Sequence, residues 1–315
     1  MRRLRVGSAV LCLLLALSGV GMAADAKVRI MSAPVLSVLP FYWMQETGAL
    51  TGVDLEINLS PDHPRNLNLV ATGQGEFLIT GLNVGAKAYV KGLPIQLVNV
   101  ATWQLDYVLA RDSSISSWAD LVGKRVNIPL QGGPVDFLFM YLIEKEGLKP
   151  TQFTFVYAPP VQAVQLLQLG QIDAAVLPEP QVTMVLNADP HARIAIDIQK
   201  EWAKWHRGAA DIPYVGLFIN KTWADANPAL AEQIAQAYVQ GVKWMNDDPQ
   251  AAAALGSRAL GMPEQVLLQS AERARLAVYD YAKTKALVDE HLTEMWQFND
   301  ELVGDTVPDA GFYRP

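Results

Sequence analysis

The stretch LVATGQGEFLI at residues 69–79 decides the fold, because it returns as LLQLGQIDAAVL at residues 166–177. Each copy has the pattern of a helix end closed by glycine, then a glutamine and an acidic turn residue, and then a short apolar strand. Outside the repeat, the strand start at Val28 matches Val126, and the helix end at Gly48 matches Gly147, at nearly the same offset. An offset this constant predicts two similar α/β lobes.

Strands and helices alternate on both sides of each copy, and this order predicts parallel strands joined by right-handed crossovers. We therefore predict an α/β fold of two lobes, each a mostly parallel sheet flanked by helices, with a helical C-terminal part. The first lobe is expected at residues 27–109 and 214–315, which include the C-terminal helices, and the second at 110–213. Two extended crossings, near 106–112 and 212–220, would form a hinge.

Residues 1–26 have the layout of a secretory signal peptide, with basic residues first, an apolar run at 9–17 and small residues before the cleavage site. The run is shorter than the roughly 20 residues that span a bilayer. Cleavage is predicted after Ala23 or Ala26. The single cysteine, Cys12, lies inside this segment, so the mature chain would contain no thiol for disulfides, metals or catalysis. These features predict a periplasmic protein.

The charge balance and the motifs exclude several classes of function. The chain carries 25 basic and 32 acidic residues, a net charge of −7, which disfavours nucleic acid because phosphate contacts need a basic face. It contains neither a Gly-x-Ser-x-Gly elbow nor a His-Glu-x-x-His motif, and its four histidines have no metal-ligand spacing. Residues 81–87 resemble a phosphate loop that is one residue short. We predict a non-enzyme without metal or cofactor, acting as a monomer.

The candidate ligand site follows from the predicted topology. In open parallel sheets, ligands bind beyond the carboxyl ends of the strands, and two such sheets would face each other across one cleft. The ligand-binding candidates that this rule selects are Ser32, Ser37, Arg65, Thr80, Asn83, Trp103, Gln131, Gly132, Gly133, Asp136, Glu179 and Tyr214.

The chemistry of these residues leaves two ligand classes open. The QGGP run at 131–134 opens a helix whose free N–H groups suit an anion, unless it only makes a tight turn, and Arg65 would clamp a carboxylate, sulfonate or phosphate. Trp103 would stack on a ring or pack in the core, and Glu179 would accept from a ligand N–H or stabilise the next helix. Asp136 suits a helix-dipole partner better than a ligand contact. The expected solute is a small organic anion or a polar heteroaromatic.

The chain resembles the exported type 2 solute-binding proteins of ABC transporters, in the branch that includes binders of taurine, alkanesulfonates, nitrate and thiamine pyrimidines. The likeness covers essentially the whole mature chain, and the order and spacing of its motifs are more specific than any one of them. The matching motifs are PFYWMQETG at 40–48, GQGEF at 73–77, WADLVGKRV at 118–126, GQIDAA at 170–175, PEP at 178–180 and PDAGFY at 308–313.

This resemblance implies a two-lobed receptor that closes on a small solute and delivers it to the permease and ATPase subunits of an importer. The related yeast-type pyrimidine synthases use cysteine and histidine chemistry, which a mature chain without cysteine would lack. Two alternatives remain: an enzyme on the same fold, similar to chorismate dehydratases, and a binding protein that senses its ligand. The export signal argues against the first, because those enzymes are cytoplasmic.

Overall fold

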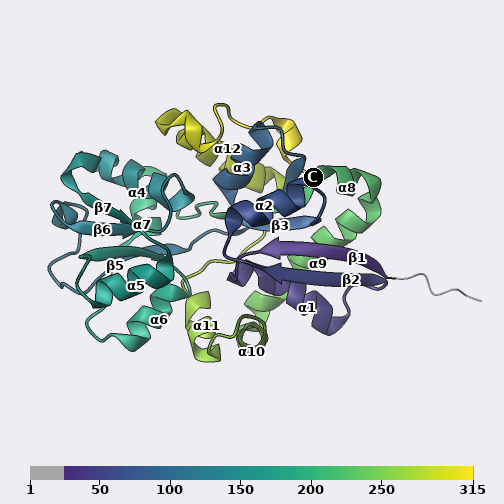
Figure 1. Ribbon diagram of the computed structural model, residues 1–315, viewed down its shortest axis with the longest axis horizontal. Coiled ribbons are helices and arrows are strands. Elements are labelled where there is room, and N and C mark those ends of the chain that lie inside the picture. Colours follow the sequence, from purple (N-terminus) through teal and green to yellow (C-terminus); the bar gives the residue numbers. More distant parts are fainter. Residues whose placement is uncertain (1–24, 315) are drawn as a thin grey trace, which may run out of the picture.

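The computed structural model describes residues 25–314, which form two lobes, each built around a five-stranded sheet with helices on its faces (Figure 1). The predicted signal peptide falls almost entirely on residues 1–24, which lie outside the described residues. The described chain opens with strand β1 at Ala26, whose N–H donates to the carbonyl of Gly52 (2.9 Å).

The first sheet has the strand order β2-β1-β3-β10-β4. Its strands are β1 (Ala26–Ser32), β2 (Val53–Leu59), β3 (Phe77–Gly81), β4 (Ile95–Thr102) and β10 (Val215–Asn220). β1 pairs in parallel with β2 and β3, whereas β10 runs antiparallel to both β3 and β4.

The second sheet has the equivalent order β7-β6-β8-β5-β9. Its strands are β5 (Asp106–Ala110), β6 (Arg125–Ile128), β7 (Thr154–Tyr157), β8 (Ala174–Pro178) and β9 (Arg193–Asp197). β6 pairs in parallel with β7 and β8, and β5 runs antiparallel to β8 and β9. In both sheets, therefore, the antiparallel strand is the one formed just after the chain crosses from the other lobe. The predicted mostly parallel sheets and their repeat are confirmed.

One predicted lobe boundary is wrong. We expected the first lobe to extend to residue 109, but β5 pairs only with strands of the second sheet, so the crossing lies earlier, at 103–105. The return crossing runs through 206–214. The segment 272–280 forms a third connection, since Arg275 N–H donates to the carbonyl of Gln104 and the Trp103 N–H donates to the carbonyl of Arg275.

Helices cover both faces of the sheets and join the lobes. Beside the first sheet lie α1 (Leu39–Thr47), α2 (His63–Ala71), α3 (Leu82–Val90), α8 (Lys221–Ala226), α9 (Pro228–Asp247) and α10 (Pro249–Leu260). The second sheet carries α4 (Pro134–Lys145), α5 (Pro160–Gln168), α6 (Gln181–Ala188) and α7 (Ile198–Trp205). The remaining helices are α11 (Glu264–Ala271) and α12 (Tyr281–Phe298), with the short 3-10 helices η1 (Leu36–Val38) and η4 (Asp300–Leu302) among the connections.

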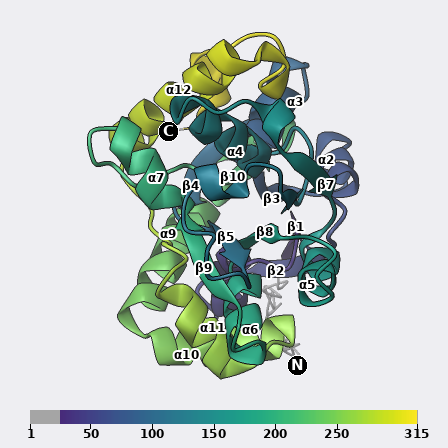
Figure 2. The same cartoon turned by 90° about the vertical axis from the view of Figure 1, so that its left-hand side faces the viewer.

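The C-terminal helices do more than support the first lobe. α11 packs on α6 of the second lobe. α12 packs on β4 and, through the ring of His291 against Phe137 (centroids 5.6 Å apart), on α4 (Figure 2). No helix within residues 25–314 combines the length and apolar character that crossing a membrane requires.

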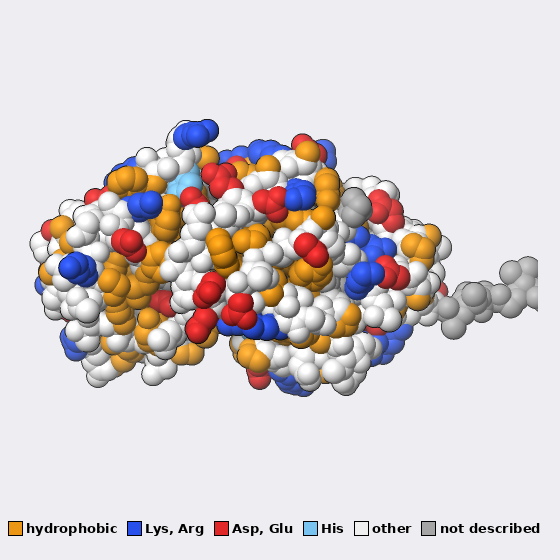
Figure 3. All heavy atoms as spheres, turned by 90° about the horizontal axis from the view of Figure 1, so that it is seen from above, with side chains coloured by type: hydrophobic (Ala, Val, Ile, Leu, Met, Phe, Trp, Pro, Cys, Tyr) orange, Lys and Arg blue, Asp and Glu red, His pale blue; other side chains and the backbone are white. Residues whose placement is uncertain are grey.

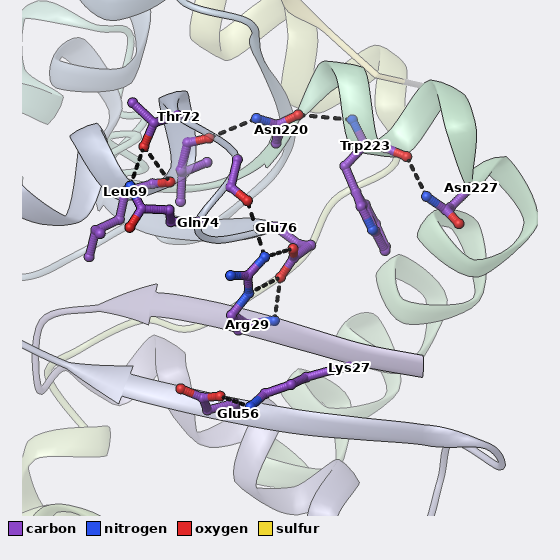
Figure 4. A network of polar contacts seen from close by, with 12 residues as sticks. Lys27, Arg29, Glu56, Leu69, Thr72, Gln74, Glu76, Asn220, Trp223 and Asn227 are labelled. Atoms are coloured by element: carbon purple, nitrogen blue, oxygen red, sulfur yellow. Dashed lines mark hydrogen bonds and ion pairs between the residues drawn. The ribbon is translucent and has the colours of Figure 1, made fainter. Parts of the chain in front are cut away.

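The repeated motif builds the same ion pair in both lobes (Figure 4 shows the first). Glu76 accepts from the backbone N–H of Arg29 (2.6 Å) and pairs with its guanidinium, which also donates to the carbonyl of Gly73 (3.1 Å). In the second lobe, Asp173 accepts from the Arg125 N–H (2.7 Å) and the Arg125 guanidinium donates to the carbonyl of Gly170 (2.8 Å). The acidic residue of each copy therefore ties a helix end to β1 in the first lobe and to β6 in the second.

Candidate functional site

The carboxyl ends of the parallel strands of both sheets point toward the junction between the lobes, which places the loops after β1, β3, β6 and β8 there. The lobes touch at this junction. The side-chain amide of Asn83, in the first turn of α3, donates to the carbonyl of Gly132 in the loop before α4 (3.3 Å). A Cβ added to Gly81 would lie 3.0 Å from Cγ of Pro134. The β3–α3 turn of the first lobe therefore meets the loop at 131–133 of the second lobe, the glycine loop, at the contact between the lobes.

Two of the predicted site residues are buried and leave polar atoms without a hydrogen-bond partner among the described residues. These atoms are Oγ of Ser37, in η1, and Oδ1 of Asn83. Both residues are only 2% exposed. Burying a polar group without a partner costs free energy, so such atoms mark positions that suit a bound solute.

Ser32 and Thr80 lie at the ends of neighbouring strands, as predicted, and are buried. The hydroxyl of Ser32 donates to the carbonyl of Ala33 (2.7 Å), and Thr80 Oγ1 lies 3.3 Å from Nδ1 of His63. His63 is not among the predicted ligand-binding residues, although it begins α2 beside the selected Arg65. Burial lowers its pKa, with Asp62 acting in the opposite direction, so the imidazole is a neutral hydrogen-bonding group at neutral pH.

The glycine loop of the second lobe is held by Asp136. The Gly132 N–H donates to Asp136 Oδ2 (2.7 Å), the Tyr157 hydroxyl donates to Oδ1 (3.1 Å), and Gly132 has a left-handed φ of +71° that favours glycine. Burial raises the pKa of Asp136, although these two donors lower it. Both carboxylate oxygens of Asp136 therefore accept hydrogen bonds that fix the conformation of this loop. Gln131 and Gly132 are exposed, while Gly133 is buried at the start of α4.

Glu179 is buried and its carboxylate is already occupied. Oε2 accepts from the N–H (3.1 Å) and hydroxyl (2.8 Å) of Thr183 in the first turn of α6, and Oε1 pairs with Nε of Arg273. We expected Glu179 either to accept from a ligand N–H or to stabilise the following helix. These contacts fit the second role. The pair also joins the start of α6 in the second lobe to the 272–280 segment that follows α11.

Trp103 and Tyr214 lie in the crossing segments and are buried. The indole N–H of Trp103 donates to the carbonyl of Ala277 (2.8 Å), and its ring packs on Tyr279 (centroids 4.8 Å apart). The Tyr214 hydroxyl donates to Oε1 of Gln199 (2.7 Å). Trp103 therefore joins the first crossing to the 272–280 segment, and Tyr214 joins the return crossing to α7. For Trp103, these contacts match the core-packing alternative.

Asp106 was also missed by sequence reasoning. It begins β5 opposite Pro178 and is 4% exposed. Burial raises its pKa to about 7. Its position was hidden because the sequence placed residue 106 in an extended crossing rather than in the second sheet.

Arg65 lies in the first turn of α2, where its backbone N–H donates to the N-cap Asp62 (2.9 Å). The residue is exposed, and its guanidinium forms no ion pair with any residue of 25–314. Within this range there is also no group of three or more His, Asp or Glu side chains arranged to hold a metal.

Comparison with known proteins gives a family and a fold. A family model described as NMT1/THI5 like matches residues 37–252, more than half of the chain. The structure is similar to that of an ABC transporter from Parabacteroides distasonis, with a TM-score of 0.75, 20% identity, and coverage of 93% of this chain and 99% of that one. Comparison with curated protein sequences gave no match.

Two further solved structures share the fold. The periplasmic aliphatic sulphonate binding protein SsuA of Escherichia coli has a TM-score of 0.73 at 18% identity, with coverage of 91% of this chain and 96% of that one. The alkanesulfonate-binding protein SsuA of Xanthomonas axonopodis pv. citri, bound to MOPS, has a TM-score of 0.70 at 19% identity with the same coverage. The predicted two-lobed binding-protein fold is confirmed.

Proposed function

This chain belongs to the NMT1/THI5-like family, and we propose that it is the extracytoplasmic solute-binding subunit of an ABC importer, which captures a small organic anion between its lobes. The observation that carries the proposal is the arrangement of the interlobe site, where strand ends of both lobes meet and the chain crosses between them. A solute that contacts both walls stabilises the closed arrangement, because only that arrangement offers all of its contacts.

Of the two solute classes that the sequence leaves open, the contacts favour the anion. The two residues that supported a heteroaromatic ring already interact with other parts of the protein. Trp103 packs on Tyr279 and donates to the carbonyl of Ala277. Glu179 accepts from Thr183 and pairs with Arg273. Arg65 is exposed in the first turn of α2, where its charge adds to the positive end of the helix dipole. The sulfonate-binding neighbours are consistent with this choice.

The remaining parts of the proposal are a periplasmic location, delivery to a permease, and a monomer that binds without catalysis. Signal cleavage after Ala23 would leave β1 intact, whereas cleavage after Ala26 would remove its first residue. We therefore expect the intact mass of the secreted protein to correspond to a chain that begins at Ala24. A mass that corresponds to a later start would contradict this choice.

The test is calorimetric titration of the purified protein with alkanesulfonates, carboxylates, nitrate and pyrimidines. We expect an organic anion to bind, and Arg65→Ala to weaken that binding about tenfold, which corresponds to one charge-assisted hydrogen bond. Arg258→Ala is the matched control, because Arg258 is an exposed arginine paired with Glu46 on α1. Binding of a pyrimidine alone, or no binding by any of these compounds, would overturn the proposed solute class. Turnover of a bound compound would favour an enzyme.

A further inference from the structure

A pocket of about 430 Å³ lies between α7 of the second lobe, the return crossing and α12, and none of its lining residues belongs to the proposed interlobe site. Helical spacing accounts for two of its walls. One face of α12 carries four lining residues at helical spacing, Leu287, Glu290, His291 and Glu294. One face of α7 likewise carries Trp202 and Trp205. The return crossing supplies the rest of the lining, which is His206, Arg207, Ala209, Asp211 and Pro213.

Aromatic side chains give the pocket a rigid apolar wall. Trp202 is buried, and its ring stacks on that of His206 with centroids 3.5 Å apart and an angle of 5° between the planes. His206 is held in turn by the carbonyl of Trp202 and by Glu294, whose Oε1 lies 2.8 Å from Nε2. Trp205, 46% exposed, leaves a large apolar surface at the rim. An indole in such a position suits contact with the body of a ligand.

The charges of the lining favour a cation. The lining holds three carboxylates and one permanent cation, Arg207, beside its two histidines, so its formal charge is negative. Two of the carboxylates are already compensated, Glu294 by His206 and Asp211 by the Tyr279 hydroxyl (2.7 Å) and Arg275 (3.3 Å). Glu290 forms no ion pair or side-chain hydrogen bond with any residue of 25–314. On the face that Figure 3 shows, both acidic and basic side chains lie around the exposed histidine.

Two buried polar atoms of the lining also have no hydrogen-bond partner among the described residues. They are Nδ1 of His291, a residue that is only 2% exposed, and Oδ1 of Asp211. Burial lowers the pKa of His291 to about 3, so it is neutral at physiological pH and does not repel a positive charge. Asp211 Oδ1 lies 3.3 Å from the guanidinium of Arg275, so its charge is already compensated.

We propose that this pocket binds a small organic cation, a primary amine or amidine with an apolar body, whose charged nitrogen pairs with Glu290 while the body packs on Trp202 and Trp205. The site is separate from the interlobe site in its residues and in the charge of its ligand. Because its walls come from α7 of one lobe and from α12, which also packs on β4 of the other, an occupant contacts both sides of the hinge.

The experiment is calorimetric titration with benzylamine, which is a cation at pH 7, and with phenylacetate, an anion of similar size and shape. We expect benzylamine to bind saturably with one site and phenylacetate to give no saturable heat. Glu290→Gln should weaken benzylamine binding at least about fivefold, because it removes the charge and keeps the shape. Glu144→Gln, an equal change of net charge at an exposed residue of α4 outside the lining, should leave the affinity within twofold.

A second variant tests whether the apolar body of the ligand contacts Trp205. Trp205→Ala removes a rim residue that is not part of the core and should also weaken benzylamine binding. Ser37→Ala, which changes a residue of the proposed interlobe site, should not change it. Equal binding of phenylacetate, an affinity that Glu290→Gln leaves unchanged, or no saturable binding of benzylamine would each overturn the proposal. Loss of anion binding at the interlobe site would not affect this result, so the two proposals fail independently.

Discussion

Ser37 is a residue of the proposed site at which a role in binding can be separated from a role in folding. Its hydroxyl is buried and has no partner among the described residues, although its backbone carbonyl accepts from the hydroxyl of Tyr238 (2.7 Å). A sequence pattern identifies such a serine only as a residue near a strand end. The missing partner becomes visible only when the neighbouring side chains are in place.

We expect Ser37→Ala to leave the free energy of unfolding unchanged within about 0.5 kcal/mol, because no hydrogen bond is lost and an unpaired buried hydroxyl is removed. The same variant should weaken solute binding about tenfold, if the solute supplies the missing partner. Chemical denaturation and calorimetric titration measure the two effects. A variant that loses stability and keeps its affinity would show that the hydroxyl has a structural role.

The repeated acidic residues allow a comparison of one contact at two levels of burial. The side chain of Glu76 is 6% exposed in its pair with Arg29, and that of Asp173 is 35% exposed in its pair with Arg125. We expect Glu76→Gln to cost about 1–3 kcal/mol of unfolding free energy and Asp173→Asn less than about 1 kcal/mol, because exposed ion pairs are screened by solvent. Urea denaturation of the two variants checks the order, and equal losses would show that burial is not what separates them.

At the scale of elements, the contact of α7 with α12 includes a titratable pair. Nδ1 of His206 lies 2.8 Å from the Trp202 carbonyl and Nε2 lies 2.8 Å from Glu294, so both ring nitrogens face acceptors and both bonds form only when the imidazole is protonated. Burial lowers the pKa of His206, but Glu294 and the Trp202 carbonyl outweigh it, and the pKa is raised.

A raised folded-state pKa stabilises the protein below the unfolded value of about 6.5, and the stabilisation is lost as pH rises through the folded value. We expect His206→Gln to lower the free energy of unfolding more at pH 6 than at pH 8.5. His191→Gln is the control, because His191 is exposed in the second lobe. Denaturation curves at both pH values provide the measurement, and a loss that is independent of pH would mean that packing on Trp202, not charge, is the contribution.

At the scale of the whole molecule, the two lobes are in contact where Gly81 faces Pro134 and Asn83 donates to Gly132. A side chain at residue 81 would occupy the space that this contact needs. The residue has φ −55° and ψ 138°, which other amino acids also adopt, so a substitution there strains no backbone.

We expect Gly81→Leu to hold the lobes apart. The radius of gyration from small-angle scattering in the presence of solute should exceed that of the unchanged protein, and the affinity for solute should fall about tenfold or more, because a solute held by one wall loses the contacts of the other. Circular dichroism verifies that the fold is intact. An unchanged affinity would show that closure at this point does not contribute to binding.

The sequence by itself determined the two-lobed α/β fold, because the repeat at 69–79 and 166–177 carries local signals: helix-ending glycines with left-handed φ (+74° at Gly73 and +67° at Gly170) and short apolar strands. It also placed the interlobe loops, since the carboxyl ends of parallel strands share one edge. These properties depend on neighbours in the chain or on general rules of topology.

Only the tertiary structure decided how each candidate side chain is used. Glu179 forms an ion pair with Arg273, and Trp103 donates to the carbonyl of Ala277, both far away in the chain. β5 joins the second sheet because it pairs with β8 and β9. The pocket between α7 and α12 likewise unites residues separated by about 90 positions. Hydrogen bonds and ion pairs depend on distances between distant segments, and no local pattern encodes those distances.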